Sequence, residues 1–231
     1  MFTQIDAILF DKDGTLFDFA ASWSGWTASV IDGLALGDDR LAEAMAQVLG
    51  YERSARRFLP HSPVIAGTLA EQVDLLLPFL QGWTPARLEA YLLAEATGST
   101  MVAPVPLPPL MEGLRARGYL LGLATNDGES SAIAHLTRAG ILHHFAHVLG
   151  YDSGYTPKPA PDMLLGFADR AGLDPARVVM VGDSTHDLIA GREAGMVTVG
   201  VLTGLATSDV LAPHADLILP DIGHLPSVLM R

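Results

Sequence analysis

The sequence has no cysteine and only two lysines, Lys12 and Lys158, and both scarcities limit the chemistry that the chain can support. Without cysteine, it forms no disulfide, holds no metal through thiolates and has no cysteine nucleophile. Basic residues number 14 against 26 acidic ones. This balance argues against nucleic acid or an anionic membrane as a partner, because both require clustered cations. No apolar run reaches the ~18 residues of a membrane-spanning helix.

The composition is that of a folded chain. Hydrophobic residues make up 49% of the 231 positions, enough for a substantial core, and a charged fraction of 17% is too low for a disordered chain. No basic residue precedes the first apolar run, so residues 1–10 do not resemble a secretion signal. We therefore expect a soluble, cytoplasmic protein, and the sequence does not indicate an oligomeric state.

Short apolar runs of strand length recur along the chain and alternate with helical patterns, such as that of Met163, Leu164 and Phe167. The expected strands are residues 5–10, 119–124, 178–181, 197–202 and 217–219. Alternation of this kind is typical of a parallel sheet covered by helices on both faces. We expect an α/β fold with a Rossmann-like parallel sheet.

One long segment, residues 19–101, interrupts this alternation. Its apolar residues recur at helical spacing. A proline-rich stretch at residues 104–109 then leads back to the strand pattern, and such stiff connectors are common at domain boundaries. We expect an all-helical domain over residues 19–101, inserted into a core domain of residues 1–18 and 102–231.

Two aspartates, Asp11 and Asp13, directly follow the first expected strand, and Gly14 then allows the backbone to turn sharply. Carboxylates two residues apart in an extended segment project to the same side. One of them can attack an electrophile while the other transfers a proton. For these residues taken alone, an acidic turn that caps a helix remains the alternative.

A second acidic pair, Asp183 and Asp187, follows the expected strand 178–181, where it can also begin a helix. Together with Asp11 and Asp13, the pair places four carboxylates at neighbouring strand ends. Two such charges about 4 Å apart repel by about 4 kcal/mol at an effective dielectric constant of about 20. Because only oxygen donors are present, Mg²⁺ is the cation that best suits this cluster.

Two further segments suggest an anion site. Thr125 and Asn126 follow the expected strand 119–124, and Lys158 lies between two prolines. A hydroxyl and backbone amides at the start of a helix bind anions, and an ammonium suits a phosphoryl oxygen. Taken singly, these residues are also compatible with a helix cap and an exposed loop lysine.

In this order, the motifs Asp-x-Asp-Gly-Thr, a strand-end Thr, a Lys and Gly-Asp-x-x-x-Asp closely resemble those of the haloacid dehalogenase-like (HAD) hydrolase superfamily. The insert resembles, in position and helical character, the cap of its phosphatases, the group that contains phosphoglycolate phosphatases. The resemblance implies that Asp11 is a nucleophile that forms an aspartyl-phosphate. It also implies that Asp13 protonates the leaving oxygen and then activates water.

The same resemblance assigns the remaining motif residues to the phosphoryl group and to a metal cofactor, Mg²⁺. It implies that Thr125, Asn126 and Lys158 bind the phosphoryl group. The implied metal site consists of Asp11, the carbonyl of Asp13, Asp183 and Asp187, the last supporting either the metal or Lys158.

Lys12 departs from the family pattern, because this phosphatase group usually has an apolar residue at that position. Backbone alternation should point its side chain away from Asp11 and Asp13. We therefore expect Lys12 to have little effect on the chemistry.

The insert offers candidates for substrate recognition. Three arginines have the i, i+3, i+4 spacing that gathers side chains on one helix face, where they form either a clamp for a substrate carboxylate or a solvated surface. The candidate substrate residues are Arg53, Arg56, Arg57 and, in the loop that follows, His61. Trp23 and Trp26 either pack the core of the insert or form an aromatic wall over the site.

These features predict a Mg²⁺-dependent phosphatase acting on a small phosphorylated metabolite, with a phosphoglycolate-like compound as a candidate. A phosphomutase on the same scaffold would use the same first two aspartates and is the nearest alternative. A phosphoacceptor signalling domain also combines acidic residues with a threonine and a lysine, but such domains are much shorter and lack the insert. A dehalogenase is disfavoured because its chemistry needs neither the metal nor the second aspartate.

Overall fold

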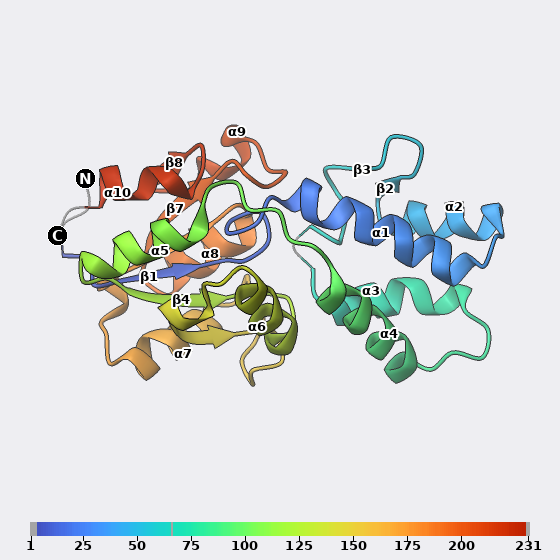
Figure 1. Ribbon diagram of the computed structural model, residues 1–231, viewed down its shortest axis with the longest axis horizontal. Coiled ribbons are helices and arrows are strands. Elements are labelled where there is room, and N and C mark those ends of the chain that lie inside the picture. The colour runs from blue at the N-terminus through green and yellow to red at the C-terminus, as the bar shows by residue number, and fades with distance from the viewer. Residues whose placement is uncertain (1–3, 66, 230–231) are drawn as a thin grey trace.

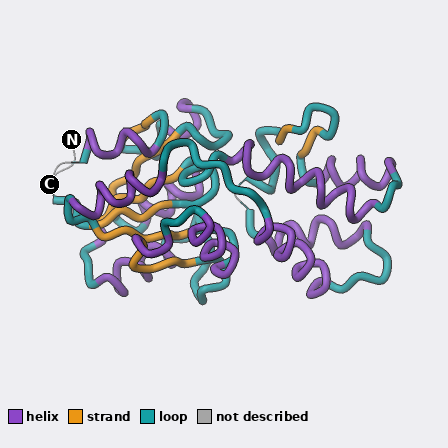
Figure 2. Tube along the Cα trace, in the orientation of Figure 1, coloured by secondary structure: helices purple, strands orange, loops and turns teal. Residues whose placement is uncertain are grey.

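A computed structural model describes residues 4–65 and 67–229. It has two lobes, joined by two chain segments that run side by side (Figure 1). The strands of the large sheet lie in one lobe, and helices dominate the other (Figure 2). Where the chain passes between them, the amide of Asp18 donates a hydrogen bond to the carbonyl of Val102 at 2.8 Å. We refer to residues 19–101 as the helical lobe and to the rest of the described chain as the sheet lobe.

Within the described ranges, the sheet lobe contains one six-stranded sheet in which every pairing is parallel. From edge to edge, its strands are β5 (Phe145–Leu149), β4 (Leu120–Ala124), β1 (Ala7–Phe10), β6 (Val178–Gly182), β7 (Val197–Val201) and β8 (Leu217–Leu219). Phe10 at the end of β1 is in register with Leu123 of β4 and Val181 of β6. The polar segments after these three strands therefore begin at the same edge of the sheet.

Helices cover both faces of this sheet. The longer ones are α5 (Leu107–Ala116), α6 (Glu129–Arg138), α7 (Asp162–Ala171) and α8 (Thr185–Glu193). Ile8 and Phe10 of β1 pack in one core with α5 and α6, whereas Ala7 and Leu9 pack in another with α7 and α8, because side chains alternate along a strand. The predicted Rossmann-like α/β sheet is confirmed. Shorter elements of this lobe are η2 (Leu142–His144), η3 (Pro175–Arg177), α9 (Ser208–Leu211), η4 (Ile222–His224) and α10 (Leu225–Val228).

The helical lobe has a hydrophobic core of its own. Its helices are α1 (Phe19–Ala35), α2 (Asp39–Val48), α3 (Leu69–Leu76), η1 (Leu77–Phe79) and α4 (Pro85–Gly98). Side chains of Asp18, Thr68 and Thr84 accept hydrogen bonds from the first turns of α1, α3 and α4, which explains where these helices begin. Nowhere in the described chain is a helix both long and apolar enough to cross a membrane.

The expectation of a purely helical insert was wrong for the segment after α2. There β2 (Tyr51–Glu52) and β3 (Arg57–Phe58) form an antiparallel hairpin. Gly50, with a φ of +59°, adopts the left-handed conformation after α2. The buried rings of Tyr51 and Phe58 then pack edge to face, with centroids 5.2 Å apart. The three arginines of this segment consequently do not share a helix face.

Candidate active site

The ends of β1, β4 and β6 bring residues that are distant in the sequence to one cavity. Those predicted from the sequence that line it are Asp11, Asp13, Thr125, Asn126, Lys158, Asp183 and Asp187. The carboxyl ends of the strands are the edge where open parallel sheets bind ligands. Because β1 lies between β4 and β6, its two aspartates face both neighbouring segments.

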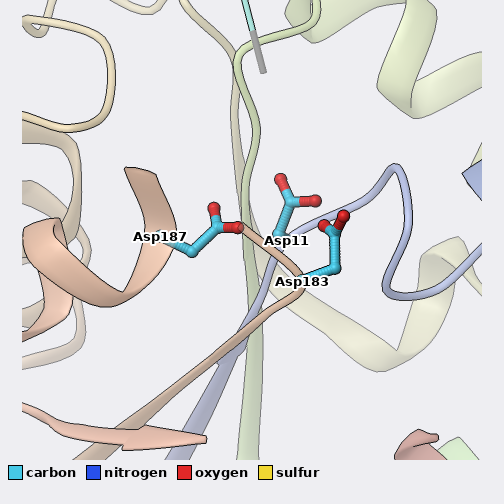
Figure 3. Close-up of side chains that lie close together, drawn as sticks. All are labelled: Asp11, Asp183 and Asp187. Carbon is cyan, nitrogen blue, oxygen red and sulfur yellow. The ribbon is translucent and has the colours of Figure 1, made fainter. Parts of the chain in front are cut away.

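Three carboxylates converge in this cavity (Figure 3). One oxygen from each of Asp11, Asp183 and Asp187 lies within 4.8 Å of the others, and all three residues are buried. Oδ2 of Asp183 is buried without a hydrogen-bond partner in the described part of the chain. A buried carboxylate oxygen without a partner is costly, and a hard cation is the natural group to satisfy it. The residues present therefore fit Mg²⁺.

Gly14 allows the loop after β1 to approach Asp183 closely. Its φ of +82° lies in the left-handed region, and a Cβ at this position would stand 2.2 Å from Oδ2 of Asp183. Any other residue would both strain the backbone and displace the carboxylate. The glycine of the first motif is thus a requirement of the site's geometry.

Lys158 is the positive charge of the cluster. Its Nζ lies 2.6 Å from Oδ1 of Asp11, 2.5 Å from Oδ1 of Asp187 and 2.8 Å from the carbonyl oxygen of Ala124, so all three ammonium protons have acceptors. Asn126 holds the loop that carries this lysine. Its Oδ1 accepts from the Lys158 amide at 3.0 Å, and its Nδ2 donates to the Lys158 carbonyl at 2.9 Å.

Asp187 is bound on both sides. Its Oδ1 contacts Lys158, and its Oδ2 accepts hydrogen bonds from the amide and the hydroxyl of Ser184, closing a capping box at the start of α8. With protein partners for both oxygens, Asp187 contributes to the cluster mainly through its charge and its hold on Lys158.

The site carries an excess of negative charge. The pKa of Asp11 is raised to about 7, because burial outweighs the attraction to Lys158 and repulsion from Asp187 and Asp13 acts in the same direction as burial. Burial, then Asp187 and Asp11, raise the pKa of Asp183 well above its ordinary value. Burial alone would lower the pKa of Lys158, but Asp11 and Asp187 outweigh it and raise that pKa. A divalent cation would relieve this repulsion.

The expectation that Lys12 points away from Asp13 was wrong. Instead of pointing away from the chemistry, its fully buried Nζ lies 2.8 Å from Oδ1 of Asp13 and 2.9 Å from Oδ2 of Asp127. Alternation does send Lys12 to the opposite side from Asp11. The chain turns from Lys12 onward, after β1 has ended at Phe10, so Asp13 does not follow the alternation of a straight strand.

The substrate candidates of the insert lie elsewhere. Of the described residues, those that line the cavity include neither His61 nor any of the three arginines. Arg53 pairs with acidic side chains of α1 and α2, and Arg57 pairs with Glu52 at 2.6 Å. Arg56 and His61 are exposed.

The two tryptophans, in contrast, both pack the core of the helical lobe and form part of the cavity wall. Trp23 and Trp26 are buried in the core of the helical lobe, and both line the cavity. Nε1 of Trp23 donates a hydrogen bond to Oδ1 of Asp13 at 2.7 Å. An aromatic side chain of the helical lobe therefore touches the candidate acid–base residue directly.

Sequence reasoning missed three residues near the site: Gln72, Asp127 and His135. Gln72 lies three residues after Leu69 on the apolar stripe of α3, and a polar residue on such a stripe is a detectable signal. Asp127 directly follows Thr125 and Asn126 in the turn after β4, and this position was its signal. His135 had no signal, since only the packing of α6 places it beside Lys12.

Comparison with known proteins identifies the class. A family model described as haloacid dehalogenase-like hydrolase matches residues 5–195. The chain therefore belongs to the haloacid dehalogenase-like hydrolases, as its motifs predicted.

Individual relatives refine this placement. The chain is 41% identical over 117 residues to the probable phosphatase IndB of Dickeya dadantii, a match that spans about half of each protein, 49% of this chain and 51% of the relative. It is 29% identical to a phosphoglycolate phosphatase of Shigella boydii, over 96% of this chain and 94% of the relative. The crystal structure of a predicted phosphoglycolate phosphatase from Haemophilus somnus has the same fold, with a TM-score of 0.69, 24% identity and 98% coverage of both chains.

Proposed function

We propose that this hydrolase is a Mg²⁺-dependent phosphatase that acts on a small phosphorylated metabolite through an aspartyl-phosphate on Asp11. The observation that carries the proposal is the buried cluster of Asp11, Asp183 and Asp187 with Lys158, at the ends of adjacent parallel strands. Relatives named as phosphatases support the same reaction class.

In the proposed reaction, the Asp11 carboxylate attacks phosphorus as the bond to the leaving oxygen breaks, and Asp13 gives its proton to that oxygen. Asp13, now a carboxylate, takes a proton from a water molecule whose oxygen attacks the aspartyl-phosphate. Phosphate leaves and Asp11 is regenerated. Thr125 and Lys158 would hold the phosphoryl oxygens, since such transfer depends mainly on positioning and charge neutralisation.

Asp11, Asp183 and the carbonyl of Asp13 would hold Mg²⁺, with Asp187 in support. When bound, the ion supplies positive charge that neutralises the phosphoryl oxygens and the carboxylates around them. Oδ2 of Asp183, which has no partner in the described chain, supports this assignment.

We further propose that residues 1–18 and 102–231 form the core domain and residues 19–101 a cap that closes over the site. The separate hydrophobic cores of the two lobes support this division. A closed cap would exclude bulk water from the phosphoryl transfer and so strengthen its electrostatic interactions.

Turnover of p-nitrophenyl phosphate with and without Mg²⁺ tests the proposal. Repeated, Mg²⁺-dependent phosphate release without a bisphosphate activator is expected. Activity that requires such an activator would indicate a phosphomutase instead. A single, long-lived phosphorylation of Asp11 would indicate a phosphoacceptor protein, and mass spectrometry of the intact chain would reveal it.

A further inference from the structure

The cavity wall opposite the carboxylates comes from the helical lobe, and it is uncharged. It includes Phe19, Trp26, Ile65, Leu69 and Gln72. Within the described chain, every side chain that the helical lobe contributes to this cavity is neutral. A leaving group held in the closed site therefore meets aromatic and aliphatic surface with a single amide.

A carboxylate on the leaving group would have no cationic partner on this wall. Arg53 and Arg57 are engaged with acidic side chains outside the cavity, and Lys158, on the sheet side, is the residue proposed to hold a phosphoryl oxygen. Burying an ionised carboxylate against apolar surface without a partner is strongly unfavourable. The wall thus disfavours acids of the phosphoglycolate type.

Two residues of this wall each carry a buried polar atom without a partner in the described part of the chain: Nε1 of Trp26 and Oε1 of Gln72. Both residues are only 7% exposed. Buried polar groups in folded proteins are nearly always hydrogen-bonded, so orphaned ones beside a cavity indicate a ligand that completes them. The indole N–H donates, and the amide of Gln72 accepts or, when rotated, donates.

We infer that the leaving group of the substrate is uncharged, presents an apolar or aromatic surface to Phe19 and Trp26, and carries neutral groups that hydrogen-bond to Trp26 and Gln72. This inference rests on the proposed phosphatase function and names its substrate class. An amide or a hydroxyl on a ring would meet both requirements.

Binding to an Asp11→Asn variant tests the substrate class separately from the reaction, because no turnover is needed. Calorimetry would compare 4-carbamoylphenyl phosphate with 4-carboxyphenyl phosphate, which differ only in charge and hydrogen bonding. We expect the carbamoyl ester to bind at least about tenfold more tightly. Equal or tighter binding of the carboxy ester overturns the inference. If the carbamoyl ester binds more tightly but the wild-type protein hydrolyses no phosphate ester, the inferred ligand class stands and the proposed reaction is overturned.

Gln72→Leu should weaken binding of the carbamoyl ester by about tenfold and leave phenyl phosphate unaffected, since one hydrogen bond is lost and the apolar wall is kept. Gln81→Leu, at an exposed glutamine outside the cavity, is the matched control and should change neither. If Gln72→Leu weakens both esters equally, Gln72 shapes the wall without recognising polar groups, and that part of the inference fails.

A second, independent observation concerns Lys12. Its ammonium contacts Oδ1 of Asp13, Oδ2 of Asp127 and, at 3.2 Å, Nδ1 of His135. An ammonium only donates, so Nδ1 accepts, and Nε2 of His135 then donates to the carbonyl of Ala96 in α4 at 2.9 Å. The Lys12 ammonium therefore has three acceptors, and both ring nitrogens of His135 have a partner.

The network joins the two lobes at two points. Trp23 of α1 donates to the same Asp13 oxygen that Lys12 contacts, and Ala96 of α4 accepts from His135 of α6. The Trp23 ring also stands 5.0 Å from the Lys12 ammonium. The Asp13 carboxylate is thus held by Lys12 of the sheet lobe and by Trp23 of the helical lobe.

The geometry points to Lys12 as a positioning residue that fixes the Asp13 carboxylate when the helical lobe is closed. Lys12→Met would remove the ammonium and keep an unbranched side chain of similar length. We expect kcat/KM, which reports formation of the aspartyl-phosphate, to fall by about 10- to 100-fold on an alkyl phosphate and much less on p-nitrophenyl phosphate, because nitrophenolate needs no proton from Asp13.

A merely structural role would reduce both activities equally, and that outcome overturns the proposal. Lys12→Met leaves Asp127 buried without its main partner, so the double variant Lys12→Met/Asp127→Asn should be compared by thermal unfolding and should keep the same leaving-group dependence. Trp23→Phe, which removes the other donor to Asp13 and keeps a ring, should show the dependence as well. If neither the double variant nor Trp23→Phe shows this dependence on the leaving group, the proposal is also contradicted.

Discussion

Within the described chain, the two walls of the cavity differ in the kind of buried polar atom that has no hydrogen-bond partner. On the sheet side, this atom is a carboxylate oxygen of Asp183, surrounded by other carboxylates and one lysine. On the helical side, the atoms are neutral groups of Trp26 and Gln72, set in apolar surface. An orphaned carboxylate calls for a cation, and an orphaned indole or amide calls for a neutral ligand.

This difference suits the sheet wall to phosphoryl transfer and the helical wall to recognition of the leaving group. The sheet edge concentrates charge because three parallel strands end together, and the same edge would serve many phosphate esters. The helical lobe contributes shape and two hydrogen-bonding groups, so it is the part of the molecule that distinguishes one leaving group from another. Arg53 and Arg57, by contrast, lie outside the cavity and pair with acidic neighbours.

The largest effect should come from Asp11→Asn on the sheet wall. Removing the nucleophile should lower kcat by about 10⁴-fold or more. Thermal unfolding should show unchanged or greater stability without metal, because one of the clustered charges is gone. Steady-state kinetics and melting curves measure both effects. An unaltered kcat would show that Asp11 is not the nucleophile.

Asp13→Asn should lower kcat by about 10²- to 10⁴-fold, the usual contribution of a positioned acid or base. The loss in kcat/KM, which reports formation of the aspartyl-phosphate, should be smaller on p-nitrophenyl phosphate than on an alkyl phosphate, since the nitrophenolate leaves without a proton. Equal losses on the two esters would assign Asp13 a structural role and weaken the contrast between the walls.

Mg²⁺ should stabilise the protein through the sheet wall alone. At a concentration of about 100 times Kd, the free energy of unfolding should rise by about 2.7 kcal/mol. Asp183→Asn should remove most of this gain, whereas Asp209→Asn, at an exposed site in α9, should retain it. Thermal melts with and without the ion provide the measurement. A gain that survives Asp183→Asn would place the metal elsewhere.

The stability of the protein should depend on pH through His135, which lies where the two lobes meet. Burial and the Lys12 ammonium lower its pKa below the ordinary value of 6.5, against opposing effects of Asp13, the Ala96 carbonyl and Asp127. The folded state then binds fewer protons than the unfolded state, so stability is lost as pH falls below 6.5 towards the folded pKa. Urea unfolding from about pH 8 to about pH 5 should show a shallower acid loss for His135→Gln than for the wild type. Parallel curves would contradict this assignment.

The smallest effect should come from the helical lobe's arginines. Arg57→Ala removes a largely exposed ion pair and should change the free energy of unfolding by less than about 1 kcal/mol. KM for carboxylate-bearing and neutral esters should stay the same. A selective rise in KM for the carboxylate-bearing esters would restore the clamp hypothesis and reverse the assignment of the two walls.

Much of the sheet wall was predictable from local patterns. Buried parallel strands have short apolar runs, and the polar residue that follows each run must lie at the sheet's carboxyl edge. Asp11, Thr125 and Asp183 could therefore be grouped before any coordinates were known. The two-residue strands β2 and β3 could not be predicted in this way, because two residues are too few to show an alternating pattern. The aromatic contact between Tyr51 and Phe58 defines their hairpin.

Lys12 shows where the sequence stops being sufficient. By itself, the sequence determined that Lys12 follows a buried strand between two aspartates and leaves that strand on the side opposite Asp11. Only the tertiary structure decided which distant groups lie there: Asp127 after β4 and His135 on α6. Local patterns encode which face a side chain takes. Its partners are decided by contacts between elements more than a hundred residues apart, which must satisfy a buried charge wherever the packing allows.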